Sequence, residues 1–452
     1  MKFKTDFLAL IALALAIFCS RGYALDWYYN PSFNYTERYT NNLRLQASNI
    51  QPPPSTMFIS TLSPTMTMGY IEDDNELNTS FNWNQLLYAE NSNLDFSEKL
   101  ANLNYLFKSD KLTGNLTGSY GDQASLGSES VQLGITGSGN VAIQVARYTR
   151  NLAPSLTYKL DEKNSLSLSG SYANTNFGAH PDTGLGLGFS PYKSSQISMT
   201  GTHTYSERLS FNITAGFNNY SAKNNIPSSC YYFEQIGNSI NPDFNNPLPC
   251  RLQYNQNSDT LNGQFGVNYA LSETWTANAS FGLRETISHT LETYTPSAYP
   301  PYNINGSANS SPSITSMGKT YALGIVHNYE KGSVTFNGSQ QISPATTGSQ
   351  QQVTQFSSTL SYGLGETLSS SITGSYLISD SINLSNVTNG AFFNRTLTSI
   401  TPNLRWQWDE NMYLQLNYTY IEQIYTQSKL AATSDSVQLQ FIYQPHLNRQ
   451  VK

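Results

Sequence analysis

The sequence predicts an all-β protein, a transmembrane antiparallel up-and-down β-barrel of about 18 strands, with about 16 as the alternative count. Segments of alternating apolar and small polar residues occur in pairs, and short charged turns join the members of each pair. Charged residues make up only 12% of the chain, whereas a soluble protein has roughly 25%. A surface so poor in charge would be poorly solvated in water, so we expect it to face lipid.

The alternation is clearest around the turn at residues 161–164. Apolar side chains occupy every second position on both sides of it, at Leu156, Tyr158, Leu160, Leu166, Leu168 and Tyr172. The positions between them carry mainly Ser, Thr and Lys. Because successive strand residues point to opposite faces, each strand has one apolar and one polar face. A membrane barrel has this pattern, with lipid outside and water inside.

The same hairpin recurs along the chain. Short turns lie near residues 72–75, 109–111, 161–164, 206–208, 272–274, 330–332, 365–367 and 409–411. Alternating with longer connections, they imply about 18 strands. We expect these strands near residues 27–39, 56–70, 77–88, 97–108, 112–120, 141–160, 165–177, 193–205, 209–221, 258–271, 275–286, 319–329, 333–342, 352–362, 368–378, 396–408, 412–424 and 435–443. In 141–160 the apolar positions change parity, which predicts a bulge or break near 147–151.

The N-terminus predicts export. Lys2 and Lys4 precede the apolar run 7–18, and small residues at 22 and 24 form a cleavage site after Ala24. Residues 1–24 are therefore expected to be a signal peptide, and residues 25–452 a single barrel without linkers. Strands persist in hydrocarbon only when a closed barrel pairs every backbone group. We therefore expect the mature protein in the outer membrane of a Gram-negative bacterium, in contact with its lipid.

The longest connections, near 222–257 and 286–318, lie opposite the charged turns. Outer-membrane barrels keep short turns in the periplasm and long loops outside, so these two are expected to be extracellular. Cys230 and Cys250 predict a disulfide that closes the first loop, with two free thiols as the alternative. Tyr299 and Tyr302, in the second loop, could stack on sugar faces, or they could simply pack the loop over the pore mouth.

Aromatic residues near the charged turns predict a girdle at the membrane interface. They are Tyr158, Tyr205, Tyr269, Tyr329, Tyr362 and Trp408. Cross-strand aromatic pairs in a soluble sheet are the alternative for any one of them.

Parity predicts which charges face the lumen. Arg284 and Arg405 fall on the polar faces of their strands, among Ser, Thr, Asn and Gln. A barrel of this size leaves an aqueous channel unless a loop folds into it. The two arginines are either part of a binding site or isolated charges in a wet lumen.

Other chemistry finds no support in the sequence. No histidine pair has metal-ligand spacing, and no nucleophile, base and acid can be nominated together, so we expect no enzyme, metal site or cofactor. The net charge of −6 and the lack of a basic run also argue against nucleic acid as a partner.

Residues 31–42 and 147–168 resemble a family of outer-membrane β-barrels associated with exosortase/PEP-CTERM systems and exopolysaccharide loci. The resemblance spans nearly all of the mature chain. It implies a barrel connected with polysaccharide or surface-protein export, with polysaccharide export components as possible partners. The alternating last strand, from Val437 to Tyr443, is the expected signal for the barrel assembly machinery, although residues 444–452 follow it.

Three functions are open at this point. The first is a porin-like conduit for exopolysaccharide or another surface polymer. The second is a plugged barrel that serves as a surface scaffold or adhesin-like binding protein. The third is a general diffusion porin.

Overall fold

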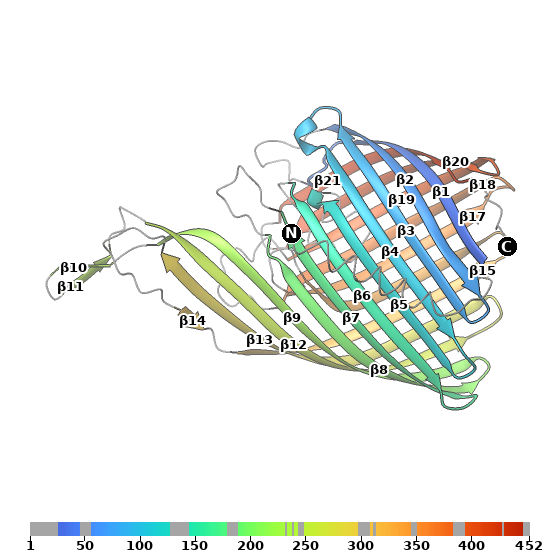
Figure 1. Cartoon of the computed structure of the whole chain (residues 1–452), viewed down its shortest axis with the longest axis horizontal. Helices are drawn as coiled ribbons and strands as arrows, with labels where there is room; N and C mark the ends of the chain where they lie inside the picture. Colours follow the sequence, from blue (N-terminus) through green and yellow to red (C-terminus); the bar gives the residue numbers. More distant parts are fainter. Residues whose placement is uncertain are drawn as a thin grey trace.

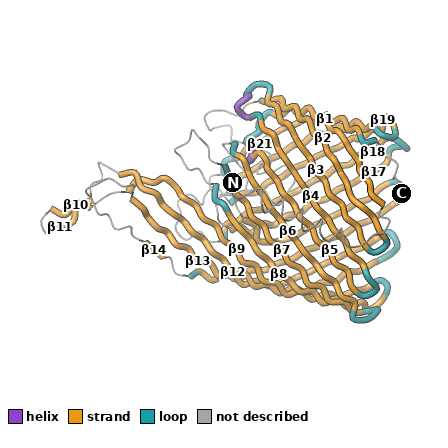
Figure 2. Tube along the Cα trace, in the orientation of Figure 1, coloured by secondary structure: helices purple, strands orange, loops and turns teal. Residues whose placement is uncertain are grey.

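The computed structural model describes residues 26–45, 56–126, 144–178, 189–230, 233–236, 239–242, 248–296, 308–310, 313–344, 350–382, 394–426 and 429–445. Within them the chain forms a closed antiparallel all-β barrel of 18 strands. The short turns cluster at one end of the barrel, which we take as the periplasmic end, and the longer connections lie at the other (Figure 2). The predicted fold class is confirmed.

The barrel strands are β1 (Asp26–Thr40), β2 (Met57–Glu72), β3 (Asn75–Tyr88), β4 (Phe96–Lys108), β5 (Leu112–Ala124), β6 (Ala146–Lys159), β7 (Asn164–Phe177), β8 (Tyr192–Ser206), β9 (Leu209–Cys230), β12 (Leu248–Ala270), β13 (Trp275–Pro296), β15 (Ile314–Tyr329), β16 (Gly332–Pro344), β17 (Gln350–Gly363), β18 (Leu368–Ser381), β19 (Arg395–Asp409), β20 (Met412–Tyr425) and β21 (Ala431–Tyr443). A 3-10 helix, η1 (Ser92–Leu94), follows β3. No helix among the described residues has the length and apolar character to cross a membrane.

The first and last strands close the barrel. β1 pairs with β2 along its whole length, and from Phe33 to Thr40 it also pairs with β21, between Tyr443 and Ser436. From Phe33 to Thr40, closure gives β1 a strand partner on both sides, whereas Asp26–Ser32 have β2 as their strand partner. Hydrocarbon favours pairing on both sides, because an unpaired N–H or C=O there costs several kcal/mol.

β6 corrects one prediction. It starts at Ala146, not near residue 141, and it runs to Lys159 without a bulge or break. Its pairing with β5 is continuous from Ala146 to Tyr158, and its pairing with β7 keeps one register throughout. Val145, just before the strand, is buried on the same parity as Arg147 and Thr149, so it is an apolar residue on the inward side and does not mark a break.

β9, β12 and β13 correct a second prediction. They are 22, 23 and 22 residues long and extend past the rest of the barrel as an arm (Figure 1). Much of 222–257 and part of 286–318, expected as loops, is therefore strand. β14 (Ala308–Ser310) pairs with β13, and β10 (Phe233–Ile236) pairs with β11 (Ser239–Pro242) at the tip of the arm.

The two cysteines lie on neighbouring strands of this arm. Cys230 pairs with Leu248, and Cys250 pairs with Ser228, so the cysteines are diagonal neighbours, two positions out of direct register. The disulfide between them stays a prediction.

Candidate functional site

The outer surface of the barrel is apolar at every second residue. On β13, Phe281 and Leu283 are exposed while Arg284, which follows Leu283, is buried, and Ile213 on β9 is 66% exposed. Large apolar side chains so exposed on most of the strands would be unstable in water, and they match a surface that faces acyl chains. The opposite parity on each strand therefore lines the lumen, which is the candidate functional site.

The predicted aromatic girdle lies on this outer surface. Tyr158, Tyr205, Tyr269, Tyr362 and Trp408 are exposed there, next to the short turns. Trp406 stacks with Trp408, with ring centroids 6.1 Å apart. Tyr329 is half-buried instead, because its hydroxyl donates a hydrogen bond to the backbone carbonyl of Ser361 at 2.9 Å. Amphipathic rings at one level are typical of a membrane interface. A closed barrel with this exterior is an outer-membrane protein.

The middle of the lumen wall is lined by paired hydroxyl and amide groups. Hydroxyls of facing residues hydrogen-bond across neighbouring strands, as in Thr157–Ser167 at 2.8 Å, Ser169–Ser198 at 2.7 Å, Thr200–Thr214 at 2.8 Å and Ser375–Ser399 at 2.7 Å. Hydroxyls both donate and accept, so each pair keeps hydrogen-bonding capacity for water or a solute. This part of the wall is polar but uncharged.

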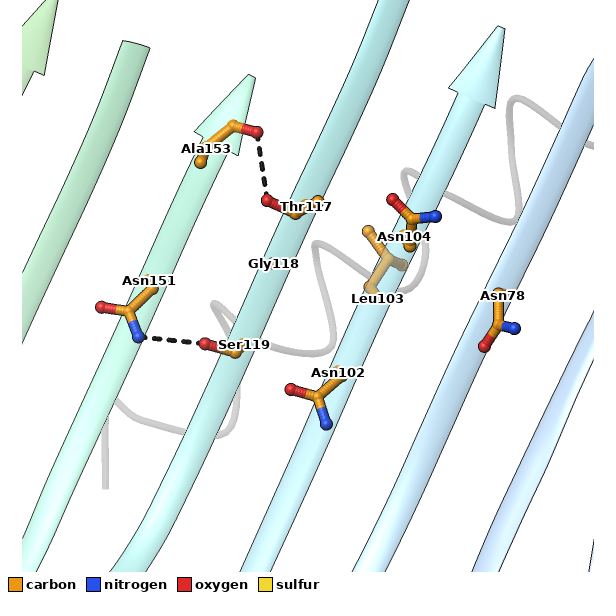
Figure 3. A pocket seen from close by; sticks show the side chains of 9 residues that line it. All are labelled: Asn78, Asn102, Leu103, Asn104, Thr117, Gly118, Ser119, Asn151 and Ala153. Atoms are coloured by element: carbon orange, nitrogen blue, oxygen red, sulfur yellow. Dashed lines mark hydrogen bonds between the residues drawn. The ribbon is translucent and has the colours of Figure 1, made fainter. Parts of the chain in front are cut away.

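A shallow hollow of about 270 Å³ lies on this wall across β3, β4, β5 and β6. Figure 3 shows its lining, which is dominated by asparagine and small side chains. Asn151 donates to Ser119 at 3.0 Å, whereas Asn78 and Asn104, which pair directly on β3 and β4, make no side-chain hydrogen bond with the described residues. Their amides are available to a polar solute.

Arg405 lies in the periplasmic half of the lumen, four residues before the end of β19 at Asp409. Its side chain is exposed, and its guanidinium carbon lies 4.1 Å from the ring centroid of Tyr413 on β20. This is a cation–π contact. The predicted inward orientation agrees with this contact, since Tyr413 occupies the lumen parity of β20.

Arg284 behaves differently although it faces the same lumen. It is 4% exposed and donates hydrogen bonds to Thr286 Oγ1 at 3.2 Å and to Gln352 Oε1 at 2.7 Å, the latter on β17. Gly318 on β15 makes room for it, because a Cβ there would lie 2.6 Å from the guanidinium carbon. The prediction of an isolated charge in a wet lumen is therefore wrong for Arg284.

The outer half of the lumen is packed by connecting segments that fold inward. Leu43, Leu94, Leu126 and Phe189 come from four different connections at this end of the barrel. They pack on the inward-facing Met57, Ile59 and Tyr88 of β2 and β3. We call this group the mouth cluster.

Leu45 anchors residues 41–45, the segment that also carries Leu43, on the other side of β1. It packs against inward-facing apolar residues of five successive strands, Val353, Leu377, Leu397, Ile421 and Ala432. Leu45 also has a positive φ of 46°, which an L-residue adopts only at a cost. Residues 41–45 therefore cross part of the lumen, with Leu43 and Leu45 held on opposite flanks.

Further arginines on the outer half of the lumen wall did not emerge from the sequence alone. Arg38 pairs with inward-facing Ile59, Arg147 pairs with inward-facing Phe177, and Arg395 donates a hydrogen bond to Gln423 at 3.2 Å. The signal that could have found them is parity, because each shares the polar parity of its own strand. Using this signal requires that the strand ends be placed correctly. For Arg147, the break expected near residues 147–151 obscured the parity of the strand.

The turn between β6 and β7 shows how the periplasmic hairpins are fixed. Asp161 accepts hydrogen bonds from the backbone N–H of Lys163 and of Asn164, each at 2.8 Å, and from the Asn164 side chain. The Asn164 side-chain bond, followed by the Lys163 backbone bond, lowers the pKa of this carboxyl. An acidic residue at the start of a tight turn is favoured for this reason.

Some predicted features lie outside the described residues. These are the signal peptide 1–24 and the loop tyrosines Tyr299 and Tyr302. Among the residues that the structure does describe, no group of three His, Cys, Asp or Glu side chains is placed to hold a metal ion.

A scan against models of known protein families gives no match, and no curated protein matches the sequence. Solved structures do match. The ferric-catecholate import receptor Fiu from E. coli K12 in its open form is 8% identical with a TM-score of 0.47, covering 94% of this chain and 82% of that one. The ferric yersiniabactin uptake receptor FyuA from Yersinia pestis is 8% identical with a TM-score of 0.45, covering 93% and 80%.

The outer membrane channel DcaP of Acinetobacter baumannii is 11% identical with a TM-score of 0.42, covering 94% of this chain and 99% of that one. These identities and TM-scores are too low to assign a function, so the function proposed below depends on the geometry of this chain.

Proposed function

We propose that the protein is a porin-like channel for hydrophilic solutes whose external mouth is constricted by residues 41–45. The observation that carries this proposal is the change along the lumen wall. The middle of the wall is lined by exposed polar groups such as Asn102, Thr117 and Asn151, whereas the outer end is packed. A wall of this kind replaces the hydration of a polar solute with hydroxyl and amide groups. No covalent chemistry is required.

Conductance of the refolded protein in planar bilayers tests this function. The proposal expects discrete ohmic steps from wild-type protein, with larger steps after Leu43→Ser and Leu45→Ser are combined. A sealed bilayer with both proteins, each retaining the heat-modifiable mobility of an intact barrel, would exclude a channel.

A second candidate, a plugged barrel that acts as a surface scaffold, is favoured by the mouth cluster and by the arm. Four connections share one apolar core with the wall, as a permanent plug would, and β9, β12 and β13 present long strands beyond the barrel. If wild-type protein and the Leu43/Leu45 variant both fail to conduct, this candidate replaces the first. Removal of residues 224–254 would then abolish partner binding without loss of the barrel.

We further propose that the transported solute is an exopolysaccharide or another surface polymer. The family resemblance and the uncharged polar wall support this, because sugar hydroxyls pair well with hydroxyl and amide groups. A deletion strain that keeps its polysaccharide inside the envelope supports the polymer conduit. Unchanged export, together with faster uptake of small sugars through the purified protein, would favour a general diffusion porin.

A further inference from the structure

The hollow on the lumen wall contains a facing pair of amides that is not bonded to itself. On β19 and β20, the facing pair Asn403 and Asn417 is joined by a hydrogen bond from the first amide to the carbonyl of the second. Asn78 and Asn104 face each other in the same way on β3 and β4, but neither side chain bonds to the described residues. Each of these two amides therefore keeps its N–H donors and its carbonyl acceptor for a ligand.

The neighbouring polar groups of the hollow add acceptors and a hydroxyl. Asn102 donates to Ser80 at 3.2 Å. Asn151 donates to Ser119 at 3.0 Å. The carbonyl oxygens of both asparagines accept no hydrogen bond from the described part of the chain, and both residues are exposed. The Ser119 hydroxyl accepts from Asn151 and still has its own hydrogen to donate.

These groups form two rows that cross four strands. The first row pairs Asn78, Asn104, Thr117 and Ala153, and the second pairs Ser80, Asn102, Ser119 and Asn151. Neighbours in a row are about 4.8 Å apart, and the rows are about 6.6 Å apart. This spacing is close to the width of a pyranose ring, and a carboxamide presents its donor and acceptor side by side, as two adjacent sugar hydroxyls do. The small side chain of Ala153 leaves the space beside the amides open (Figure 3).

The lining fits a neutral, hydroxylated ligand better than a charged or a peptide one. The described residues that line the hollow carry no charge, so an ionic group would lose hydration there without gaining a partner. An extended peptide would add to a free sheet edge, but β3, β4, β5 and β6 each pair with a strand on both sides. A volume of about 270 Å³ fits a short stretch of a glycan.

We propose that the hollow is a saccharide-binding subsite, at which neutral sugar units of the polymer bind through the amides of Asn78 and Asn104. The inference deepens the proposed function and rests on it. Asn78 and Asn104 lie three and four residues from the periplasmic ends of β3 and β4, whereas the mouth cluster lies at the other end. A chain that enters from the periplasm therefore contacts the hollow before the constriction at residues 41–45. Binding there has to be weak, because a conduit must release each unit that it binds.

Isothermal titration of the mature barrel, in a detergent without a sugar headgroup, tests the inference. The probes are maltotriose, cellotriose and triacetylchitotriose, and at least one should bind with a Kd of about 1 to 10 mM. Combining Asn78→Ala with Asn104→Ala should weaken that binding about tenfold. The matched control combines Asn403→Ala with Asn417→Ala, a pair at a similar height that bonds to itself, and it should leave the Kd unchanged.

Ala153→Leu is a second variant, which keeps every amide but fills the hollow, and it should also weaken binding about tenfold. Heat-modifiable mobility checks that each variant forms an intact barrel. No binding of any probe, or equal binding by wild type and the Asn78/Asn104 variant, would overturn the inference and leave a conducting channel standing. Tighter binding of trialanine or trigalacturonate than of the neutral sugars would also overturn it. Sugar binding that is lost in the Asn78/Asn104 variant, from a protein that gives no conductance steps, would instead refute the conduit and keep the subsite.

Discussion

Arg284 and Arg405 face the same lumen from strands with the same alternation, yet one is 4% exposed and the other is solvent-exposed. Arg405 is near the periplasmic end, where its cross-strand neighbours Ser369 and Gln415 are polar and its side chain is exposed. Arg284 is farther from the periplasmic end, where Gly318 leaves room for its guanidinium and Thr286 and Gln352 accept hydrogen bonds from it. Binary alternation thus decides which side of the wall a residue faces, but contacts with residues distant in sequence decide whether it is exposed there.

The largest effect on stability is expected on β2, which runs through both the periplasmic and the outer half of the barrel. Ile59 and Ile71 on β2 share the inward parity, and they are 5% and 37% exposed. Ile59→Ala removes packing from the mouth cluster and should lower the free energy of unfolding by about 2 to 4 kcal/mol. Ile71→Ala should cost less than about 1 kcal/mol. Urea unfolding in lipid vesicles measures both, and equal losses would mean that the two halves do not differ.

A second test releases the constriction. Combining Leu43→Ser with Leu45→Ser detaches residues 41–45 from both apolar flanks, and the single-channel conductance should rise about threefold or more because the narrowest part widens. Asn102→Ser, on the exposed middle of the wall, is the control and should leave the conductance within about 20% of wild type. If the double variant conducts like wild type, the constriction lies elsewhere.

A third test displaces the buried arginine without removing it. Gly318→Ala places a Cβ against the Arg284 guanidinium, which must shift and lose its bond to Gln352. A lost hydrogen bond to a charged group costs about 1.5 to 3 kcal/mol, and any new hydrogen bond of the shifted side chain would reduce this loss. Gly374→Ala is matched, because no atom lies within 4 Å of its added Cβ. Gly318→Ala should therefore have the lower melting temperature of the two variants. A higher melting temperature for Gly318→Ala than for Gly374→Ala would contradict the contact.

The smallest effect is expected at the periplasmic turn of Asp161. Its pKa is lower in the folded state than in the unfolded one, so its contribution to stability is present above the unfolded pKa and is lost as pH falls through the folded pKa. The difference in unfolding midpoint between wild type and Asp161→Ala should therefore shrink between about pH 6 and about pH 3.

Glu162→Ala is the control for this turn, because the described residues offer its carboxylate no hydrogen bond. Measured alongside Asp161→Ala, it shows the effect of removing a carboxylate that makes none of the Asp161 hydrogen bonds. If the difference in unfolding midpoint between wild type and Asp161→Ala did not change with pH, the Asp161 carboxylate would contribute no charge-assisted hydrogen bond.

The strand count and most strand positions could be predicted from the sequence because each hairpin repeats the same local rule. Apolar residues at every second position, a ring near the interface and a charged turn recur at all eight periplasmic turns, so strands such as β7, β8 and β18 were placed within a few residues. Arg405 could be placed for the same reason.

The outer half could not be predicted because its structure depends on contacts between segments distant in sequence. Nothing local indicates that Leu43 and Leu45 lie on separate flanks of the lumen, or that Gly318 leaves room for Arg284. The extension of β9, β12 and β13 was also missed, since Pro, Asn and Cys in these segments are typical of loops.

Labelling of single cysteines at two adjacent residues tests the central claim most directly. Asn278 and Ala279 on β13 are both exposed, on opposite faces of the wall. In a background with Cys230 and Cys250 replaced by serine, a charged, water-soluble thiol reagent applied to outer-membrane vesicles should modify Asn278→Cys from the lumen and leave Ala279→Cys unmodified, while a lipid-soluble reagent should show the reverse preference. Equal labelling of both positions by the water-soluble reagent would contradict a barrel with lipid outside and water inside.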